Sequence, residues 1–272
     1  MRKRFGWLGL SLGFALLAAT SAARAQKIPL DGVLRDFESS GAYVLTVDGK
    51  AADAEIYESN TPAVLVIAPA LPTPVLLRPG KAATVETVAL EKVSRQDDGT
   101  VGLLADAELL PLGKFKPAGA SVTFAYGGHR VSLDPKPPLI GAHTAAELLA
   151  HDPAYARNAA EYRPGPNAVA TLRAATAPVT VRVFFGSWCP YCKRHVPNLL
   201  ALEEELAGSN VTIEYVGLPA PPAAWKDPEA VRLQVTSTPT AIVLVDGKAV
   251  GRLVGDDWTA PEVELARLVA RR

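Results

Sequence analysis

The chain has 272 residues, with 49% hydrophobic and 21% charged side chains and 28 basic residues against 28 acidic ones. This balance argues against a nucleic-acid-binding protein or one that binds anionic lipid, and the length suits two domains of ordinary size. The 2 cysteines lie in one short motif, so the chain has no cysteines left for a structural disulfide elsewhere.

Residues 1–25 are predicted to be an export signal. The basic residues Arg2, Lys3 and Arg4 precede an apolar run from Trp7 to Ala19, and Ala23-Arg24-Ala25 forms a cleavage site. This run is too short for a spanning helix, although an uncleaved anchor is the alternative. Cleavage would remove four basic residues and no acidic one, which changes the formal charge from +0 to −4. We therefore expect an exported protein, in the periplasm, without stable membrane insertion.

Residues 26–138 are predicted to form a β-rich domain. Apolar or alternating runs indicate strands at 43–47, 55–57, 63–68, 74–77, 84–93, 121–126 and 130–133. Turn residues separate them at Asp48-Gly49, Gln96–Gly99 and Gly127-Gly128. This spacing is typical of a small sandwich or barrel. His129 is interpreted as a solvated loop residue. Dimerisation, contact with client proteins, holding the catalytic domain in a larger assembly and a purely stabilising role are all open for this domain.

Residues 139–166 are predicted to be a helical connector. The proline-rich segment Asp134–Pro138 is stiff and marks the end of the β-rich domain. Thr144–Glu147 fits a capping box that opens a helix through His151, and Asp152-Pro153 starts a second helix towards Tyr162. His143 and His151 are interpreted as ordinary surface residues.

The last domain, 167–272, contains the motif around which the chain is organised. A β-branched and aromatic run at 181–185 predicts a buried strand, and Cys189 follows as the start of a helix. At a helix N-terminus, free backbone N–H groups and the helix dipole stabilise a thiolate. Cys192 is placed to resolve a mixed disulfide formed at Cys189. Pro190 suits the first helical turn.

The other elements of this domain complete an α/β pattern. Asn167 is predicted to cap a helix to Ala175, and Asp227 to cap one at 228–233. Strands are expected at 211–216, 241–245 and 250–254, and the box Thr259–Glu262 is expected to start the last helix. The predicted fold is a central mixed sheet covered by helices on both faces.

Three other uses of the cysteines are less favoured. A zinc site lacks further cysteines, and adding His195 would crowd three ligands onto one and a half helical turns. Covalent haem attachment requires a histidine where Lys193 stands. A structural disulfide would close a larger loop to gain stability. Redox activity of Cys189 and Cys192 is therefore the preferred hypothesis.

This region resembles the thioredoxin-fold disulfide oxidoreductases. Trp188 stands immediately before Cys189, Pro197 lies five residues after Cys192, and Val235–Thr240 is similar to the loop that carries the family's cis-proline. The resemblance implies catalysis by Cys189 and Cys192 and substrate contacts through five residues: Trp188, Pro190, Tyr191, Thr238 and Pro239. It implies a redox-active disulfide without organic cofactor or metal.

Two departures leave the direction of electron flow open. The short segment between Cys192 and Pro239 resembles a thioredoxin or TlpA-like scaffold, whereas C-P-Y-C with Thr238 before the proline is similar to the DsbG pairing. Thioredoxins also have a buried aspartate where this chain has Val183. Ionisation of Cys192 would then need water, another side chain or the substrate thiol.

Three functions are carried forward. The first is an exported oxidoreductase that reduces or isomerises client proteins and exchanges electrons with a membrane or soluble redox partner. The second is a dedicated reductant for cytochrome c maturation. The third is a binding or chaperone protein in which the cysteine pair is sensory or vestigial, with dimerisation through the β-rich domain as one arrangement.

Overall fold

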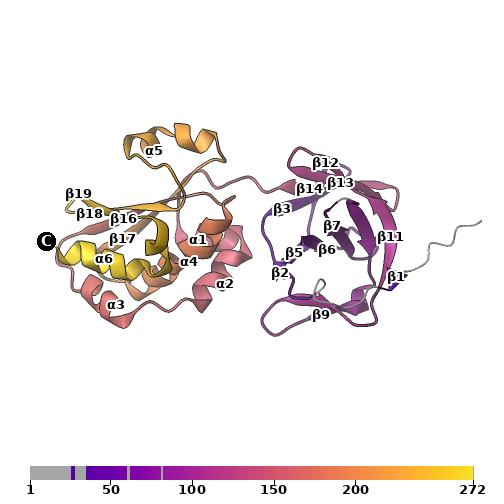
Figure 1. Cartoon of the computed structure of the whole chain (residues 1–272), viewed down its shortest axis with the longest axis horizontal. Helices are drawn as coiled ribbons and strands as arrows, with labels where there is room; N and C mark the ends of the chain where they lie inside the picture. The colour runs from indigo at the N-terminus through magenta and orange to yellow at the C-terminus, as the bar shows by residue number, and fades with distance from the viewer. Residues whose placement is uncertain (1–25, 28–34, 60–61, 81, 272) are drawn as a thin grey trace, which may run out of the picture.

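The computed structural model describes residues 26–27, 35–59, 62–80 and 82–271. These residues form two lobes that follow one another along the chain, a β-rich one and an α/β one (Figure 1). The predicted export signal lies outside the described residues. Within them, no helix is long and apolar enough to cross a membrane.

The N-terminal lobe consists of short strands and one 3-10 turn. They are β1 (Gln26–Lys27), β2 (Glu38–Ser39), β3 (Tyr43–Val47), β4 (Lys50–Ala52), β5 (Glu55–Ser59), β6 (Ala63–Ile67), β7 (Val75–Arg78), β8 (Thr84–Thr87), η1 (Leu90–Lys92), β9 (Val93–Arg95), β10 (Val101–Leu103), β11 (Glu108–Lys114), β12 (Lys116–Ala118), β13 (Ser121–Tyr126) and β14 (His129–Pro135). The predicted hairpins at Asp48-Gly49, Gln96–Gly99 and Gly127-Gly128 are confirmed as the turns β3–β4, β9–β10 and β13–β14.

Two sheets of this lobe enclose its main core. A seven-stranded sheet runs β1-β11-β8-β7-β6-β5-β2, and a five-stranded sheet runs β12-β13-β14-β3-β4. Alternating side chains from both sheets, among them Val66 and Val131, fill the space between them. The other face of the seven-stranded sheet packs Leu65 and Leu76 against the small β9–β10 hairpin. The β-rich prediction is confirmed.

The long strand predicted over 84–93 is wrong. Strand β8 ends at Thr87 because its partner β7 begins opposite, at Val75, directly after Pro74. The chain then makes the 3-10 turn η1, in which Lys92 N–H donates to the Ala89 carbonyl. It continues as β9, which pairs with β10 in a separate sheet. The alternation of apolar residues over 84–93 gives no sign that the chain changes its pairing strand after Thr87.

The C-terminal lobe is a mixed sheet with helices on both faces. Its elements are β15 (Gly141–His143), α1 (Ala145–His151), α2 (Pro153–Glu161), α3 (Pro166–Arg173), β16 (Val179–Phe185), α4 (Pro190–Glu205), β17 (Val211–Gly217), η2 (Ala223–Lys226), α5 (Pro228–Arg232), β18 (Thr240–Val245), β19 (Lys248–Leu253), η3 (Gly255–Thr259) and α6 (Pro261–Ala270). The strand order is β15-β17-β16-β18-β19, with β16 and β17 parallel and the other pairs antiparallel. The predicted fold class is confirmed.

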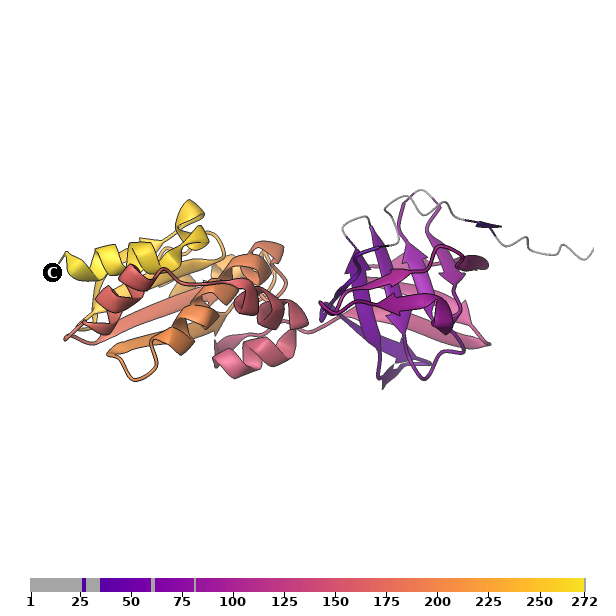
Figure 2. The same ribbon diagram turned by 90° about the horizontal axis from the view of Figure 1, so that it is seen from below.

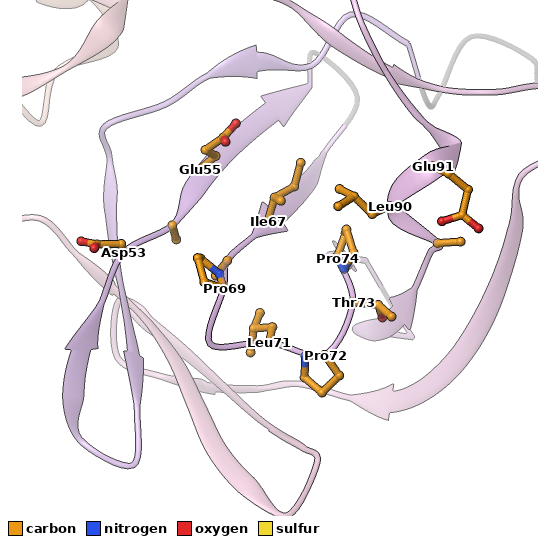
Figure 3. Close-up of a pocket in the computed structure, with 13 residues that line it drawn as sticks. Asp53, Glu55, Ile67, Pro69, Leu71, Pro72, Thr73, Pro74, Leu90 and Glu91 are labelled. Atoms are coloured by element: carbon orange, nitrogen blue, oxygen red, sulfur yellow. The ribbon is translucent and has the colours of Figure 1, made fainter.

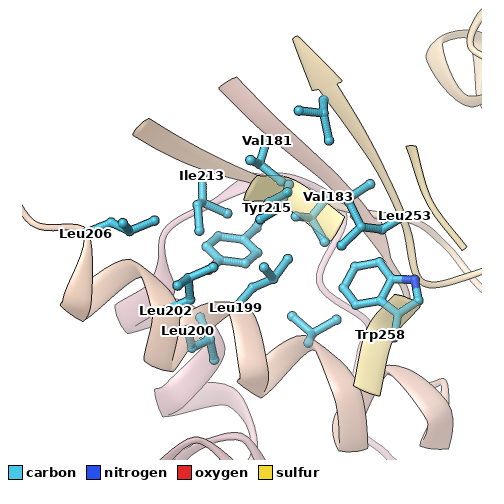
Figure 4. Packing of buried hydrophobic residues seen from close by; sticks show 14 of the residues in the cluster. Val181, Val183, Leu199, Leu200, Leu202, Leu206, Ile213, Tyr215, Leu253 and Trp258 are labelled. Carbon is cyan, nitrogen blue, oxygen red and sulfur yellow. The ribbon is translucent and has the colours of Figure 1, made fainter. Parts of the chain in front are cut away.

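The two faces of this sheet carry different layers. One face packs Val181 and Val183 against α2, α3, α4 and α6, with Trp258 and Tyr215 fully enclosed (Figure 4). On the other face, Phe184 and Ile242 pack against η2 and α5. Strand β16 therefore supplies apolar side chains to both layers, as expected of a strand in the middle of a sheet.

The segment 139–166 is not a separate connector. Strand β15 is hydrogen-bonded to β17 as an edge strand of the mixed sheet. Leu148 of α1 and Tyr155 of α2 are fully buried in the core beneath that sheet. The predicted capping box at Thr144 is confirmed. The histidines differ from the prediction, because the His143 side chain is only 16% exposed and His151 is half-buried.

Two predicted helix caps are wrong. Helix α3 begins at Pro166 with Gly165 as its N-cap, so Asn167 lies inside the first turn. Helix α6 has Ala260 as its N-cap, and the Thr259 hydroxyl donates to the Asp256 carbonyl instead. Glu262 accepts from Tyr162 Oη at 2.5 Å and from Gly165 N at 3.0 Å, which uses its carboxylate to hold α3 against α6.

The two lobes lie end to end along the long axis of the molecule (Figure 2), and a hydrogen bond joins the β2–β3 loop to the junction of α1 and α2. Gly41 N donates to Asp152 Oδ1 at 3.2 Å, and Arg157 forms an ion pair of 2.7 Å with Glu38. A Cβ atom at Gly41 would lie 2.7 Å from the His151 carbonyl oxygen. Glycine is therefore required here by close approach of the two backbones.

Candidate active site

Cys189 forms the N-cap of helix α4, as the motif predicted. Its backbone is extended, and its sulfur accepts a hydrogen bond from Cys192 N at 3.4 Å. This is the position at which a capping side chain satisfies one of the free N–H groups of the first turn. The residue is 8% exposed, so the sulfur is covered but borders the surface.

Cys192 lies one turn into the same helix and is 0% exposed. Gly186 N, at the end of β16, donates to its sulfur at 3.4 Å. Both cysteines are free thiols in this structure. The pair therefore consists of one sulfur at the surface and one sulfur beneath it, in contact through the helix turn.

The two thiols have opposite acidities. A hydrogen bond from the Cys192 side chain, reinforced by the backbone N–H of the first turn, lowers the pKa of Cys189 to about 5. Burial raises the pKa of Cys192 far above its ordinary value, and the neighbouring Cys189 sulfur adds to the effect. At neutral pH Cys189 is thus the thiol that ionises more readily, and Cys192 keeps its proton.

The loop before β18 faces Cys189. The Thr238–Pro239 peptide bond is cis. The Thr238 carbonyl oxygen lies 3.8 Å from the Cys189 sulfur, which donates to it. Pro239 is buried and Thr238 is half-buried beside the cysteine pair. The structure thus brings the Val235–Thr240 loop and the cysteine motif together, although 46 residues separate Cys192 from Thr238 in the sequence.

The remaining predicted contact residues near Cys189 differ in how exposed their side chains are. Pro190 and Tyr191 are exposed, and the Tyr191 ring lies 4.2 Å, centroid to centroid, from the His195 ring. Trp188 is half-buried because its indole Nε1 donates to the Leu218 carbonyl at 3.0 Å. Tyr191 is therefore the more exposed of the two aromatic side chains, and Trp188 is held by the loop at Leu218.

The site contains a buried carboxylate that sequence reasoning missed. Val183 is fully buried on β16, so that strand supplies no carboxylate. Instead Asp152 from α2 forms an ion pair of 2.7 Å with Lys193, the residue after Cys192. Burial would raise the pKa of Asp152, but Lys193 and the amides of Ala154 and Gly41 lower it. The sequence marks Asp152 only as a helix cap, and nothing local shows that it reaches Lys193.

Other candidate groups do not assemble into a site. Among the described residues, no group of three or more His, Cys, Asp or Glu side chains is placed to hold a metal ion. Burial lowers the pKa of His195, so it is a neutral ring at physiological pH. His129 is exposed and lies 2.7 Å from Asp48 in the β3–β4 turn region, far along the chain from the cysteines.

Among the pockets formed by the described residues, two bear on the site, and neither is lined by the cysteines. One of about 830 Å³ opens in the N-terminal lobe between β5, β6 and η1, lined by apolar side chains such as Leu71 and Leu90 with Glu91 at its rim (Figure 3). The other, of about 250 Å³, lies between the lobes, where Tyr43 and Lys136 face Ser187 and Trp188. The second pocket borders the loop that leads into Cys189.

Comparison with known proteins identifies the class of the C-terminal lobe. A family model described as a thioredoxin-like domain matches residues 166–264. Together with the mixed sheet and the position of the cysteine helix, this match establishes that the C-terminal lobe is a thioredoxin-like domain. The match begins after α2, so α1, α2 and the β-rich lobe lie outside it.

The matching relatives are thioredoxins. The thioredoxins of Chlamydia caviae and Chlamydia trachomatis are each 42% identical over 72 residues, which is 26% of this chain and 64% of theirs. The chain thus spans less than two thirds of the length of these relatives. A solved thioredoxin of Fasciola hepatica is 27% identical over 34% of this chain and 81% of its own, with a TM-score of 0.27. A protein of unknown function from Pseudomonas aeruginosa is 17% identical over 48% of this chain and 93% of its own, with a TM-score of 0.40.

Proposed function

We propose that this protein is an exported thiol–disulfide oxidoreductase that exchanges disulfides with client proteins through Cys189 and Cys192. The observation that carries the proposal is the pair of thiols at the N-terminus of α4, one at the surface with a lowered pKa and one buried with a raised pKa. Such a difference suits a nucleophile and a resolving thiol. A redox-active disulfide is then the sole cofactor, and no metal is involved.

The exchange proceeds in two steps. The Cys189 thiolate attacks one sulfur of a client disulfide, which forms a mixed disulfide and releases the other client sulfur as a thiolate. Cys192 then attacks the Cys189 sulfur, which forms the Cys189–Cys192 disulfide and releases the second client sulfur. The client gains two electrons that the pair loses, and the protons of the pair pass to the client thiols. The reverse sequence oxidises a client.

Client binding is proposed on both sides of Cys189. Thr238 and Pro239 border the sulfur on one side, where an extended client segment would align with the loop by strand addition. Trp188, Pro190 and Tyr191 lie on the other side, with Tyr191 the most open to contact. The pocket between the lobes adjoins Trp188, so the β-rich lobe borders this surface and is proposed to share in holding clients.

The test is disulfide exchange with a peptide that carries a fluorophore and a quencher on either side of one disulfide. We expect the wild-type protein to separate the two dyes, and Cys189→Ala to lose this activity while its circular dichroism stays unchanged. A Cys189→Ala variant as active as the wild type would overturn the proposal. Export to the periplasm, and reduction by a membrane or soluble partner, are proposed with the function and are tested by cell fractionation and by alkylation of the pair in cells.

A further inference from the structure

Strand β16 supplies no carboxylate that could assist ionisation of the resolving thiol, Cys192. Cys192 is fully buried, its pKa is raised by burial, and the nearest strand position holds Val183. In the dithiol form its proton is shared with the Cys189 sulfur through the hydrogen bond between the two side chains. Once Cys189 is part of a mixed disulfide, it is no longer a thiolate and this partner is lost. Among the ways in which ionisation of Cys192 could be assisted, a polar side chain in the core can be sought in the structure.

Tyr155 is a polar group in the right part of that core. The residue is 0% exposed and belongs to the same buried cluster as Cys189 and Cys192. Its hydroxyl is buried and has no hydrogen-bond partner among the described residues. A buried hydroxyl without a partner destabilises a fold, so a phenylalanine would pack at lower cost at this position. A function explains the presence of this buried hydroxyl better than packing does.

The packing of α2 on α4 places Tyr155 beside the cysteine turn. Asp152 is three residues before Tyr155 and forms the 2.7 Å ion pair with Lys193 Nζ. Asn158 is three residues after it and donates from Nδ2 to the Lys193 carbonyl at 2.8 Å. Residues three apart share one helix face. The face that carries Tyr155 is thus held on both sides against the residue that follows Cys192.

The electrostatics agree with this placement. Burial is the first cause of the raised pKa of Tyr155, and the charges of Cys192, Asp152 and Cys189 follow in that order. The hydroxyl is therefore a neutral donor within electrostatic range of both sulfurs. Asp152 and Lys193, the other charged side chains at this face, are paired with each other.

We propose that Tyr155 is a positioning residue for the resolving step, and that its hydroxyl donates a hydrogen bond to the Cys192 sulfur when that sulfur ionises. The Cys192 sulfur attacks the Cys189 sulfur, the new Cys189–Cys192 bond forms, and the bond from Cys189 to the client breaks. The client sulfur leaves with the electron pair and takes up the proton that Cys192 loses. This inference rests on the proposed disulfide exchange, and it assigns part of the reaction to a helix outside the thioredoxin-like match.

The test follows the mixed disulfide in time. Reduced protein is mixed with a peptide disulfide, quenched with acid and analysed by intact mass, so that formation at Cys189 and decay through Cys192 are separate phases. We expect Tyr155→Phe to form the mixed disulfide at the wild-type rate and to resolve it about tenfold more slowly, the loss of one hydrogen bond to an ion. Because losing one pK unit of stabilisation lowers the thiolate fraction of Cys192 tenfold, the plot of decay rate against pH should lie about one unit to the alkaline side of the wild-type plot.

The control is Tyr215→Phe. Tyr215 is another buried tyrosine of this lobe (Figure 4), but its hydroxyl bonds to Glu203 Oε2 at 2.9 Å, near the C-terminal end of α4, whereas the cysteines lie at the N-terminal end. We expect this variant to resolve the mixed disulfide at the wild-type rate. A 3-fluorotyrosine at position 155, whose hydroxyl is a stronger donor of nearly the same size, should resolve it faster than the wild type.

Each outcome bears on one claim. If the wild type and Cys192→Ser form no mixed disulfide, the proposed function falls. If the mixed disulfide forms and Tyr155→Phe resolves it as fast as the wild type, the function stands and the role of Tyr155 is wrong. A hydroxyl with no role predicts that unchanged rate, together with an unfolding midpoint that does not fall.

Discussion

The two lobes differ in that one contains a large pocket and the other contains the pair of thiols. The β-rich lobe contains the 830 Å³ pocket, and Glu55 at its edge is paired with Arg95. In the thioredoxin-like lobe the pKa of Cys189 is lowered by hydrogen bonds from the Cys192 side chain and backbone, and the pKa of Cys192 is raised by burial. Reactivity in this protein follows from backbone N–H groups and burial rather than from the size of a cavity.

The lobes nonetheless share one contact of consequence. The Gly41 amide of the β-rich lobe and the Lys193 ammonium of the thioredoxin-like lobe bind the same carboxylate, Asp152. The β-rich lobe therefore contacts the thioredoxin-like lobe at the buried carboxylate of Asp152, next to the residue that follows Cys192. Four changes test how far this division of roles holds.

The largest effect is expected at the nucleophile. Cys189→Ser should abolish disulfide exchange because a hydroxyl does not ionise in this pH range, and the far-UV circular dichroism should stay that of the wild type. The matched change in the other lobe is Leu90→Ser, at a residue that is 55% exposed beside the larger pocket. Exchange with the dye-labelled peptide should be unaffected by it. Loss of activity in Leu90→Ser would show that the β-rich pocket takes part in the reaction.

The second effect concerns pH. The pKa of Cys189 is about 5 rather than the ordinary value of 9.0, so the thiolate predominates above pH 5 and is lost as the pH falls below it. The rate of alkylation of Cys189 by iodoacetamide should therefore rise with a midpoint near 5 and be level from pH 7 to pH 8, where an ordinary thiol still gains reactivity with pH. A midpoint near 9 would contradict the helix-cap account of this thiol.

The third effect is on stability, and it separates the lobes. Leu65 on β6 and Leu199 on α4 are both 0% exposed, but they belong to the cores of different lobes. Leu65→Ala should destabilise the β-rich lobe by about 2–5 kcal/mol through loss of contacts and a residual cavity. Leu199→Ala should do the same in the other lobe. Calorimetry with Cys189 alkylation as a local probe should show that Leu65→Ala leaves the midpoint of thiol exposure unchanged, and a common shift would mean that the lobes unfold as one unit.

The smallest effect is expected at the contact between the lobes. Gly41→Val would place a Cβ 2.7 Å from the His151 carbonyl and should separate the β2–β3 loop from Asp152. We expect a larger radius of gyration in X-ray scattering and a decrease of about twofold to fivefold in exchange with a folded client, the order of one lost hydrogen bond. Exchange with a short peptide should change less. The control is Ala51→Val on exposed β4, which adds the same methyl groups without a contact.

The sequence predicted the thioredoxin-like lobe well because its signals are local. The run at 181–185, the helix start at Cys189 and the Asp227 cap each depend on residues within one turn, and the structure has a strand or helix at each. The mixed sheet followed from the order of these elements. The same local reasoning predicted helix caps at Asn167 and Thr259, but the N-caps are Gly165 and Ala260. Glu262 accepts a hydrogen bond from Gly165 N, a contact between α3 and α6 that the local sequence does not express.

The features that were missed depend on long-range pairing. Strand β11 carries a proline and a glycine and mostly exposed side chains, so its sequence has little strand character, yet it pairs with β8. Strand β15 has three residues and is fixed only by β17, more than 70 residues later. The nearness of Asp152 and Tyr155 to the cysteines arises from the packing of α2 on α4, which no spacing in the sequence expresses.

The reduction potential of the Cys189–Cys192 pair tests the central claim most directly. A stabilised Cys189 thiolate favours the reduced form, which makes the pair a stronger oxidant than thioredoxin. We therefore predict reversible equilibration with glutathione buffers at about −120 to −180 mV, in the range of oxidases and isomerases. A value near about −270 mV would contradict the stabilised thiolate and indicate a thioredoxin-like reductant. A pair that does not cycle at all would contradict redox function.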